Sequence, residues 1–96
     1  IKTINNAGVN SSVMKPGSVR QMVIEWKTPP ANKGYATEWY VKNNTSKGTK
    51  ITNDGVLTIG DDEKNGYPTV GVNVDTKSAP SGAKPVNKEI SIQIQA

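Results

Sequence analysis

Apolar and polar residues alternate one by one in four segments of this sequence, and this period of two constrains the fold more than any other feature. Successive side chains of an extended strand point to opposite faces, so alternation gives each segment one apolar and one polar face. The four segments cover residues 19–28, 37–42, 69–75 and 88–95. No stretch of useful length shows the 3.6-residue period of an amphipathic helix. The pattern therefore predicts an all-β protein.

The apolar face of each alternating segment is expected to form the core. Trp26 ends the apolar face of the first segment, and Trp39 begins that of the second. The predicted core residues are Met22, Ile24, Trp26, Trp39, Val41, Val70, Val72, Val74, Ile90, Ile92 and Ile94.

Shorter strands and turns are predicted between the four segments. Residues 2–4 and 12–14 could form a broken first strand, while 49–52 and 56–59 flank the tight-turn sequence Asn53-Asp54-Gly55. Lys15-Pro16-Gly17 is a second turn, and loops are expected at 29–34, 61–68 and 78–85. About seven short strands in 96 residues predict an antiparallel two-sheet sandwich. A small barrel such as an OB-fold is the alternative.

Histidine and cysteine are both missing, and their absence excludes whole classes of chemistry. The sequence has no His and no Cys. Histidine bases, Ser-His-Asp and Cys-His arrangements, thiol catalysis and disulfides are therefore excluded. We expect a protein that is not an enzyme and holds no cofactor and no metal.

The basic charge is dispersed along the chain. The formal net charge is +4, and Arg20 is the only arginine among twelve cations. Sequence-specific DNA binding uses arginine forks, and single-strand binding uses aromatic rings in a basic groove. We therefore expect a solubilising surface and no nucleic-acid partner. No apolar run approaches the roughly 20 residues of a membrane span, so no membrane insertion is expected.

The length fits one domain, residues 1–96. Because the sequence starts at Ile1 and carries no signal-peptide pattern, we expect it to be a segment excised from a longer protein.

The order of turns, strands and tryptophan resembles the group 2 bacterial immunoglobulin-like domains. Gly17 is similar to the turn glycine before the family's second strand, and Pro29 to the proline that ends that strand. Trp39 resembles the core tryptophan, and Gly55 with Leu57 resembles the family's Gly-x-Val stretch. The resemblance extends from about residue 15 to residue 95.

The resemblance implies a structural role. Such domains occur in bacterial surface adhesins and in phage head and tail proteins, so it implies a non-enzymatic spacer or decoration module, located in a virion or on the bacterial cell surface. Its partners would be other domains or subunits of the parent assembly, with weak attachment to a cell-surface glycan as an added role. A single Lys-rich module favours a phage parent by analogy. The alternatives are a carbohydrate-binding module and a nucleic-acid-binding barrel.

Three tyrosines are the candidate surface contacts: Tyr35, Tyr40 and Tyr67. Asp61-Asp62-Glu63 is the only acidic cluster, and it lacks the alternate spacing of an EF-hand. We expect a solvated loop there, with carboxylates that point in different directions. Glu25 and Glu38 are the only candidates for a hydrolytic carboxylate pair, and a small sandwich seldom provides the cleft that such a pair needs.

Overall fold

The computed structural model describes residues 3–6, 11–27, 36–75 and 86–96, which form strands and no helix. The strands are β1 (Thr3–Asn6), β2 (Val13–Met14), β3 (Val19–Glu25), β4 (Ala36–Lys42), β5 (Lys50–Ile51), β6 (Val56–Thr58), β7 (Thr69–Asp75), β8 (Val86–Ser91) and β9 (Gln93–Ile94). Within these ranges no helix is long and apolar enough to cross a membrane.

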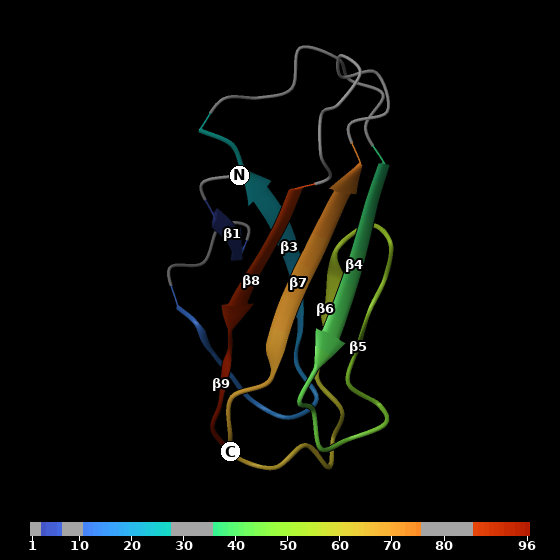
Figure 1. The fold of residues 1–96 in the computed structure, drawn as a ribbon. Coiled ribbons are helices and arrows are strands. Elements are labelled where there is room, and N and C mark those ends of the chain that lie inside the picture. The colour runs from blue at the N-terminus through green and yellow to red at the C-terminus, as the bar shows by residue number, and fades with distance from the viewer. Residues whose placement is uncertain (1–2, 7–10, 28–35, 76–85) are drawn as a thin grey trace.

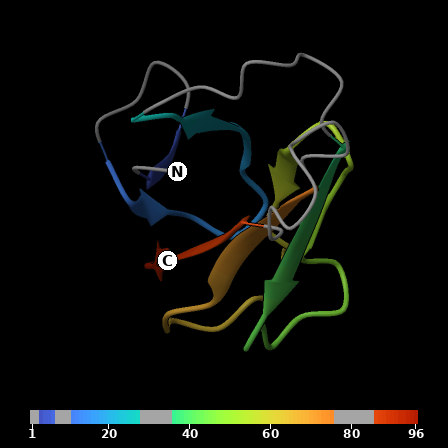
Figure 2. The same ribbon diagram turned by 45° about the horizontal axis from the view of Figure 1, so that its top comes forward.

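The strands form two antiparallel sheets and one short parallel pair. The first sheet has the order β1-β3-β6-β5, the second has the order β4-β7-β8, and β2 pairs with β9 in parallel. Figure 1 shows β4, β7 and β8 side by side, and the turned view of Figure 2 separates β3 from β4. The fold is therefore all-β, and it is consistent with the predicted sandwich.

A third small sheet lies at the end of the domain where Ala96 is found (Figure 1). The strand that begins as β8 breaks at Ile92 and continues as β9. On one side of β9, Gly66 and Ile94 exchange backbone hydrogen bonds of 3.3 and 2.8 Å. On its other side, Val13 and Met14 of β2 pair with Gln93 and Ile94. Both backbone edges of β9 are thus occupied.

The core lies between the inner faces of the sheets. The cluster joins Ile4, Met22 and Leu57 of the first sheet to residues of the second sheet and of the β2–β9 pair. Its other members are Met14, Trp39, Ile59, Val70, Val72, Val74, Ile92 and Ile94. Burying a large aliphatic side chain stabilises the fold by about 1.5–3 kcal/mol, so this shared cluster is what holds the layers together.

Two turns require glycine. Gly17 and Gly55 have φ values of 82° and 81°, which only glycine adopts readily. Gly55 also lies under Trp39, because a Cβ added there would be 3.1 Å from Trp39 Cε2. The glycine therefore allows both the turn and the close approach of the indole ring.

The sequence predictions of the strands are largely confirmed. The predicted segment 69–75 is β7 itself, and Trp39, Val70, Val72, Val74, Ile92 and Ile94 are buried as expected. Nine strands replace the predicted seven or so in the described ranges, since the first and last strands are each broken in two.

Two details of the prediction are wrong. The strand expected over 19–28 ends at Glu25, and Trp26 lies beyond it, partly buried against the core. The segment 61–68 is not entirely loop, because Gly66 pairs with β9. The predicted loops 29–34 and 78–85 lie outside the described residues.

Candidate functional site

The three tyrosines named from the sequence do not form one surface. Tyr35 lies outside the described residues, Tyr40 is half-buried in β4, and Tyr67 is 65% exposed ahead of β7. The structure therefore separates the roles of Tyr40 and Tyr67.

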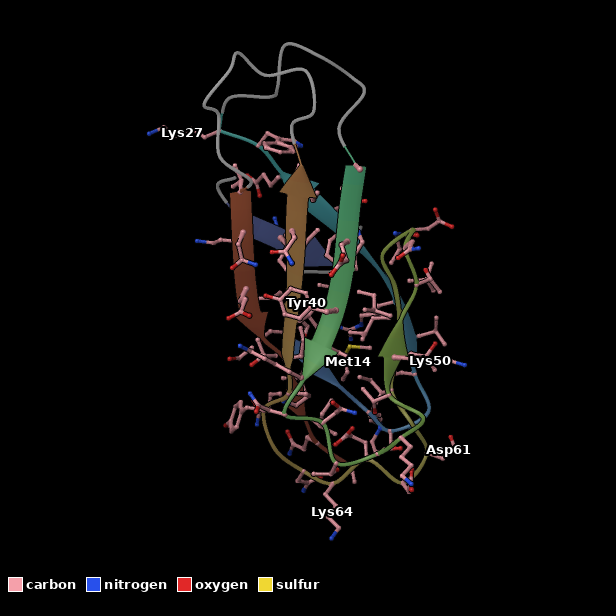
Figure 3. All side chains as sticks on the ribbon, turned by 45° about the vertical axis from the view of Figure 1, so that its right-hand side comes forward. Met14, Lys27, Tyr40, Lys50, Asp61 and Lys64 are labelled. Carbon is pink, nitrogen blue, oxygen red and sulfur yellow. The ribbon has the colours of Figure 1, made fainter. Side chains whose placement is uncertain are left out.

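Tyr40 packs against its own sheet. It is paired in register with Gly71 of β7, which is paired in turn with Glu89 of β8. The Tyr40 ring lies across β7 (Figure 3), where a side chain on Gly71 would collide with it. The ring covers the glycine, and its hydroxyl reaches Glu89 two strands away.

A polar network holds the Tyr40 hydroxyl. Tyr40 Oη donates a hydrogen bond to Glu89, Asn87 Nδ2 donates one to Tyr40 Oη at 3.0 Å, and Lys42 Nζ lies 3.0 Å from Glu89 Oε2. The bond to Glu89, with a smaller contribution from burial, raises the pKa of Tyr40. The bonds from Tyr40 and then Lys42 lower the pKa of Glu89. Tyr40 is therefore a cross-strand packing residue whose hydroxyl is engaged, and the expectation that it offers a free contact is not supported.

Tyr67 is positioned by the small sheet around β9. Gly66 pairs with Ile94, and Ile92 N donates to Pro68 O at 3.0 Å, so Tyr67 stands opposite Gln93. Pro68 is buried, and the alternation of the strand turns Tyr67 outward. Within the described part of the chain, the Tyr67 hydroxyl has no hydrogen-bond partner. Its ring is free to contact a ligand.

Two shallow hollows flank β9. The first, the Tyr67 hollow, is lined by Asn65, Gly66, Tyr67, Gln93, Ile94 and Gln95 and has a volume of about 340 Å³. The second, the Arg20 hollow, has a volume of about 500 Å³, and its lining includes Ser11, Val13, Lys15, Ser18, Arg20 and Gln95. Gln95 lines both hollows, so they adjoin across β9.

The Arg20 hollow is basic. Arg20 Nη1 donates to Ser11 O at 2.7 Å, and Arg20 Nη2 donates to Val13 O at 2.8 Å. These bonds fix the plane of the guanidinium beside β2 and leave further N–H groups unused. The Lys15 side chain is exposed on the same lining, and no Asp or Glu side chain lines either hollow within the described residues.

Sequence reasoning found Tyr67 but missed its neighbours. Asn65, Gln93 and Gln95 are ordinary polar residues in the sequence, and only the pairing of 66–68 with β9 brings them together. The sequence signal that could have indicated this surface is the alternation that places Gln93 and Gln95 on the outer face of the last strand.

One member of the acidic cluster, Glu63, is buried, while Asp61 and Asp62 are exposed as predicted. Glu63 is only 5% exposed, which contradicts the prediction for this residue. Its Oε2 accepts hydrogen bonds from Thr45 N at 2.7 Å and from Thr45 Oγ1, and its Oε1 accepts them from Ser46 N at 3.2 Å and Thr49 Oγ1 at 2.5 Å. A carboxylate can be buried here because four donors surround it.

The pKa of Glu63 reflects two opposing effects. Burial raises this pKa, but the hydrogen bonds from Thr45, Thr49 and the backbone together outweigh burial and hold it below the ordinary 4.5. Glu63 is therefore ionised at neutral pH and ties the 45–49 loop to the 60–63 turn.

The neighbouring carboxylates point elsewhere, as predicted. Asp62 accepts a hydrogen bond from Ser46 Oγ, and Asp61 lies beside Gly17. Figure 3 shows Asp61 and Lys64 at the same end of the domain, both directed outward. Among the described residues, no group of three or more acidic side chains is placed to hold a metal ion.

Glu25 and Glu38 are not brought together as a hydrolytic pair. Glu25 lies in β3 of one sheet, where it accepts a hydrogen bond from Asn5 Nδ2, and Glu38 lies in β4 of the other.

No model of a known protein family matches the chain, and no curated protein is significantly similar to it in sequence.

Proposed function

We propose that the chain is an immunoglobulin-like structural module of a phage virion protein or of a bacterial surface protein, of the group 2 bacterial kind. The observation that carries the proposal is the strand order. If β2 is counted with the first strand and β9 with the last, the order β1-β3-β6-β5 corresponds to A-B-E-D and β4-β7-β8 to C-F-G. This is the order of a constant-type immunoglobulin sandwich.

The buried tryptophan supports the same proposal. Immunoglobulin domains place a core tryptophan on strand C, and Trp39 lies on β4, the corresponding strand, with 8% of its surface exposed. The resemblance of Gly17 and Gly55 to the family's turn glycines agrees with their positive φ angles.

The shape suits a spacer or decoration. The domain measures 45 × 25 × 17 Å, and β9 leads the chain to Ala96 at one narrow end (Figure 1). The role requires no catalysis. A module of this kind contributes length, and its surfaces provide contacts.

A carbohydrate-binding module is the second candidate, and the exposed Tyr67 ring beside three amide side chains favours it. Such modules bind sugars on exposed aromatic rings. In the described part of the chain, Tyr67 is the one aromatic ring that is mainly exposed, so we place binding second, as a weak attachment added to the structural role.

The test is the location of the module. Antibodies raised against the domain should label intact virus particles, or the surface of unbroken cells, that carry the gene. Labelling that appears only after the cells are broken would overturn the proposal. Particles or cells that lack the gene provide the control for nonspecific antibody adhesion.

A further inference from the structure

The two hollows beside β9 form one surface, which we name the β9 groove. Tyr67 stands opposite Gln93 on one side of β9, and Val13 pairs with Gln93 on the other. Neighbouring strands lie about 4.8 Å apart, so this row of three side chains spans roughly 10 Å. Gln95 lines both hollows, so the two adjoin at this residue.

The groove offers side chains and no free backbone. β9 is paired on both sides, by Gly66 and by β2, so a peptide cannot add to it as a further strand. Both hollows are shallow and open, with no deep apolar socket for an anchoring side chain. A ligand must therefore lie across the face of the small sheet.

The polar groups of the groove match sugar hydroxyls. Gln93 and Gln95 each carry a carbonyl acceptor and an amide donor, which can bond to neighbouring hydroxyl groups. Asn65 adds an amide donor, while its Oδ1 accepts a hydrogen bond from Ala96 N at 3.0 Å. Tyr67 adds an exposed ring with a flat apolar face. One apolar ring beside several amides is the chemistry that receives a pyranose ring.

The charge of the groove selects an acidic sugar chain. Lys15 and Arg20 line the Arg20 hollow, and no described Asp or Glu side chain lines either hollow. Asp61 lies beside Gly17 but outside the lining. A carboxylate on the ligand would therefore meet the two cations Lys15 and Arg20, beside Ala96 on the same lining.

We infer that the β9 groove binds an acidic polysaccharide, with a pyranose ring on Tyr67 and a uronate carboxylate at Lys15 and Arg20. The inference names a ligand for the attachment role. It rests on the proposed function only in placing the module on the surface of a virion or cell. The amides of β9 orient the chain between these two points.

The test is a titration of the whole chain with a uronic-acid tetrasaccharide, followed by amide NMR shifts. We expect weak binding with shifts confined to 13–15, 18–20, 65–67 and 93–96. A neutral tetrasaccharide of the same linkage should bind several-fold more weakly, and a glutamate peptide of equal charge should cause no shift at Tyr67.

Three variants locate the binding. Tyr67→Ala should weaken binding about tenfold, and Lys15→Gln about fivefold, in line with an exposed charged contact. Lys50→Gln is the matched control, because it removes the same charge from an exposed side chain of β5, the edge strand of the first sheet, outside the lining of both hollows, and it should leave the affinity unchanged.

Three results would overturn the inference. The first two are equal binding of the neutral tetrasaccharide and equal binding of the glutamate peptide. The third is the absence of shifts at 10 mM sugar, a concentration that would reveal a Kd of 10 mM, or a binding free energy of only about 2.7 kcal/mol. The location experiment is independent of this titration, so a surface module without sugar binding would leave the proposed function standing.

Discussion

Replacing Glu63 with glutamine tests the buried network that joins the 45–49 loop to the 60–63 turn. Four donors surround the carboxylate, two at each oxygen, and two of the four are backbone N–H groups. Glutamine keeps one carbonyl oxygen and turns an NH₂ group toward the other pair of donors. A threonine hydroxyl can rotate to accept from it, but a backbone N–H cannot.

The expected loss of stability follows from the number of donors that lose their acceptor. One buried backbone N–H loses its acceptor, which costs about 1–3 kcal/mol, and the remaining bonds lose the strength that the charge gives them. We expect Glu63→Gln to reduce the free energy of unfolding by about 2–3 kcal/mol at pH 7. In a domain of this size, that lowers Tm by about 10–20 °C.

The stabilisation by Glu63 should depend on pH, and the direction of the change follows from the pKa of its carboxyl group. Because the folded-state pKa of Glu63 is depressed, its stabilisation is present above the ordinary value of 4.5 and is lost as pH falls through the folded pKa. The wild-type protein should therefore lose its advantage over Glu63→Gln between about pH 5 and pH 3, measured by urea unfolding and tryptophan fluorescence.

Glu38→Gln is the matched control, since Glu38 is exposed in β4, and it should change stability by less than about 0.5 kcal/mol. The reasoning is refuted if Glu63→Gln and Glu38→Gln unfold alike at pH 7, or if the advantage of the wild type over Glu63→Gln persists undiminished at pH 3.

Three further predictions concern Trp39 in the core, the contact between Tyr40 and Gly71, and metal binding. Trp39→Ala should cost about 3–5 kcal/mol in urea unfolding, and a cost below 1 kcal/mol would mean that the indole is not a core residue. Gly71→Ala should cost about 1–3 kcal/mol, because the new methyl group displaces the Tyr40 ring; adding Tyr40→Ala should make the Gly71→Ala change nearly neutral, and additive costs would refute the contact. Thermal melts with calcium and with a chelator should agree, because the carboxylates of 61–63 point in different directions; a calcium-dependent rise of several degrees would contradict this geometry.

The alternation of the sequence determined the strands well, because a period of two has a direct structural meaning. It predicted β7 to the residue and placed Trp39, Val72 and Ile92 in the core. It could not show that the last strand breaks at Ile92, since the apolar alternation continues unbroken through that residue.

The pairings that build the surfaces depend on register between distant strands, which the sequence does not display. Tyr40 covers Gly71 only because β4 and β7 pair in one particular register. Glu63 was interpreted as solvated because its donors, Thr45, Ser46 and Thr49, come from another loop. The β9 groove likewise exists only because Gly66 pairs with Ile94.

The central claim is the immunoglobulin-like strand order, and cross-strand NOEs between backbone protons test it most directly. The account predicts contacts between Val13 and Gln93 in a parallel pair, and antiparallel contacts of β3 with β1 and β6 and of β7 with β4 and β8. Continuous hydrogen-bonded ladders between β1 and β8 and between β4 and β5 would close the sheets into a barrel. That result would contradict the account and restore the barrel alternative.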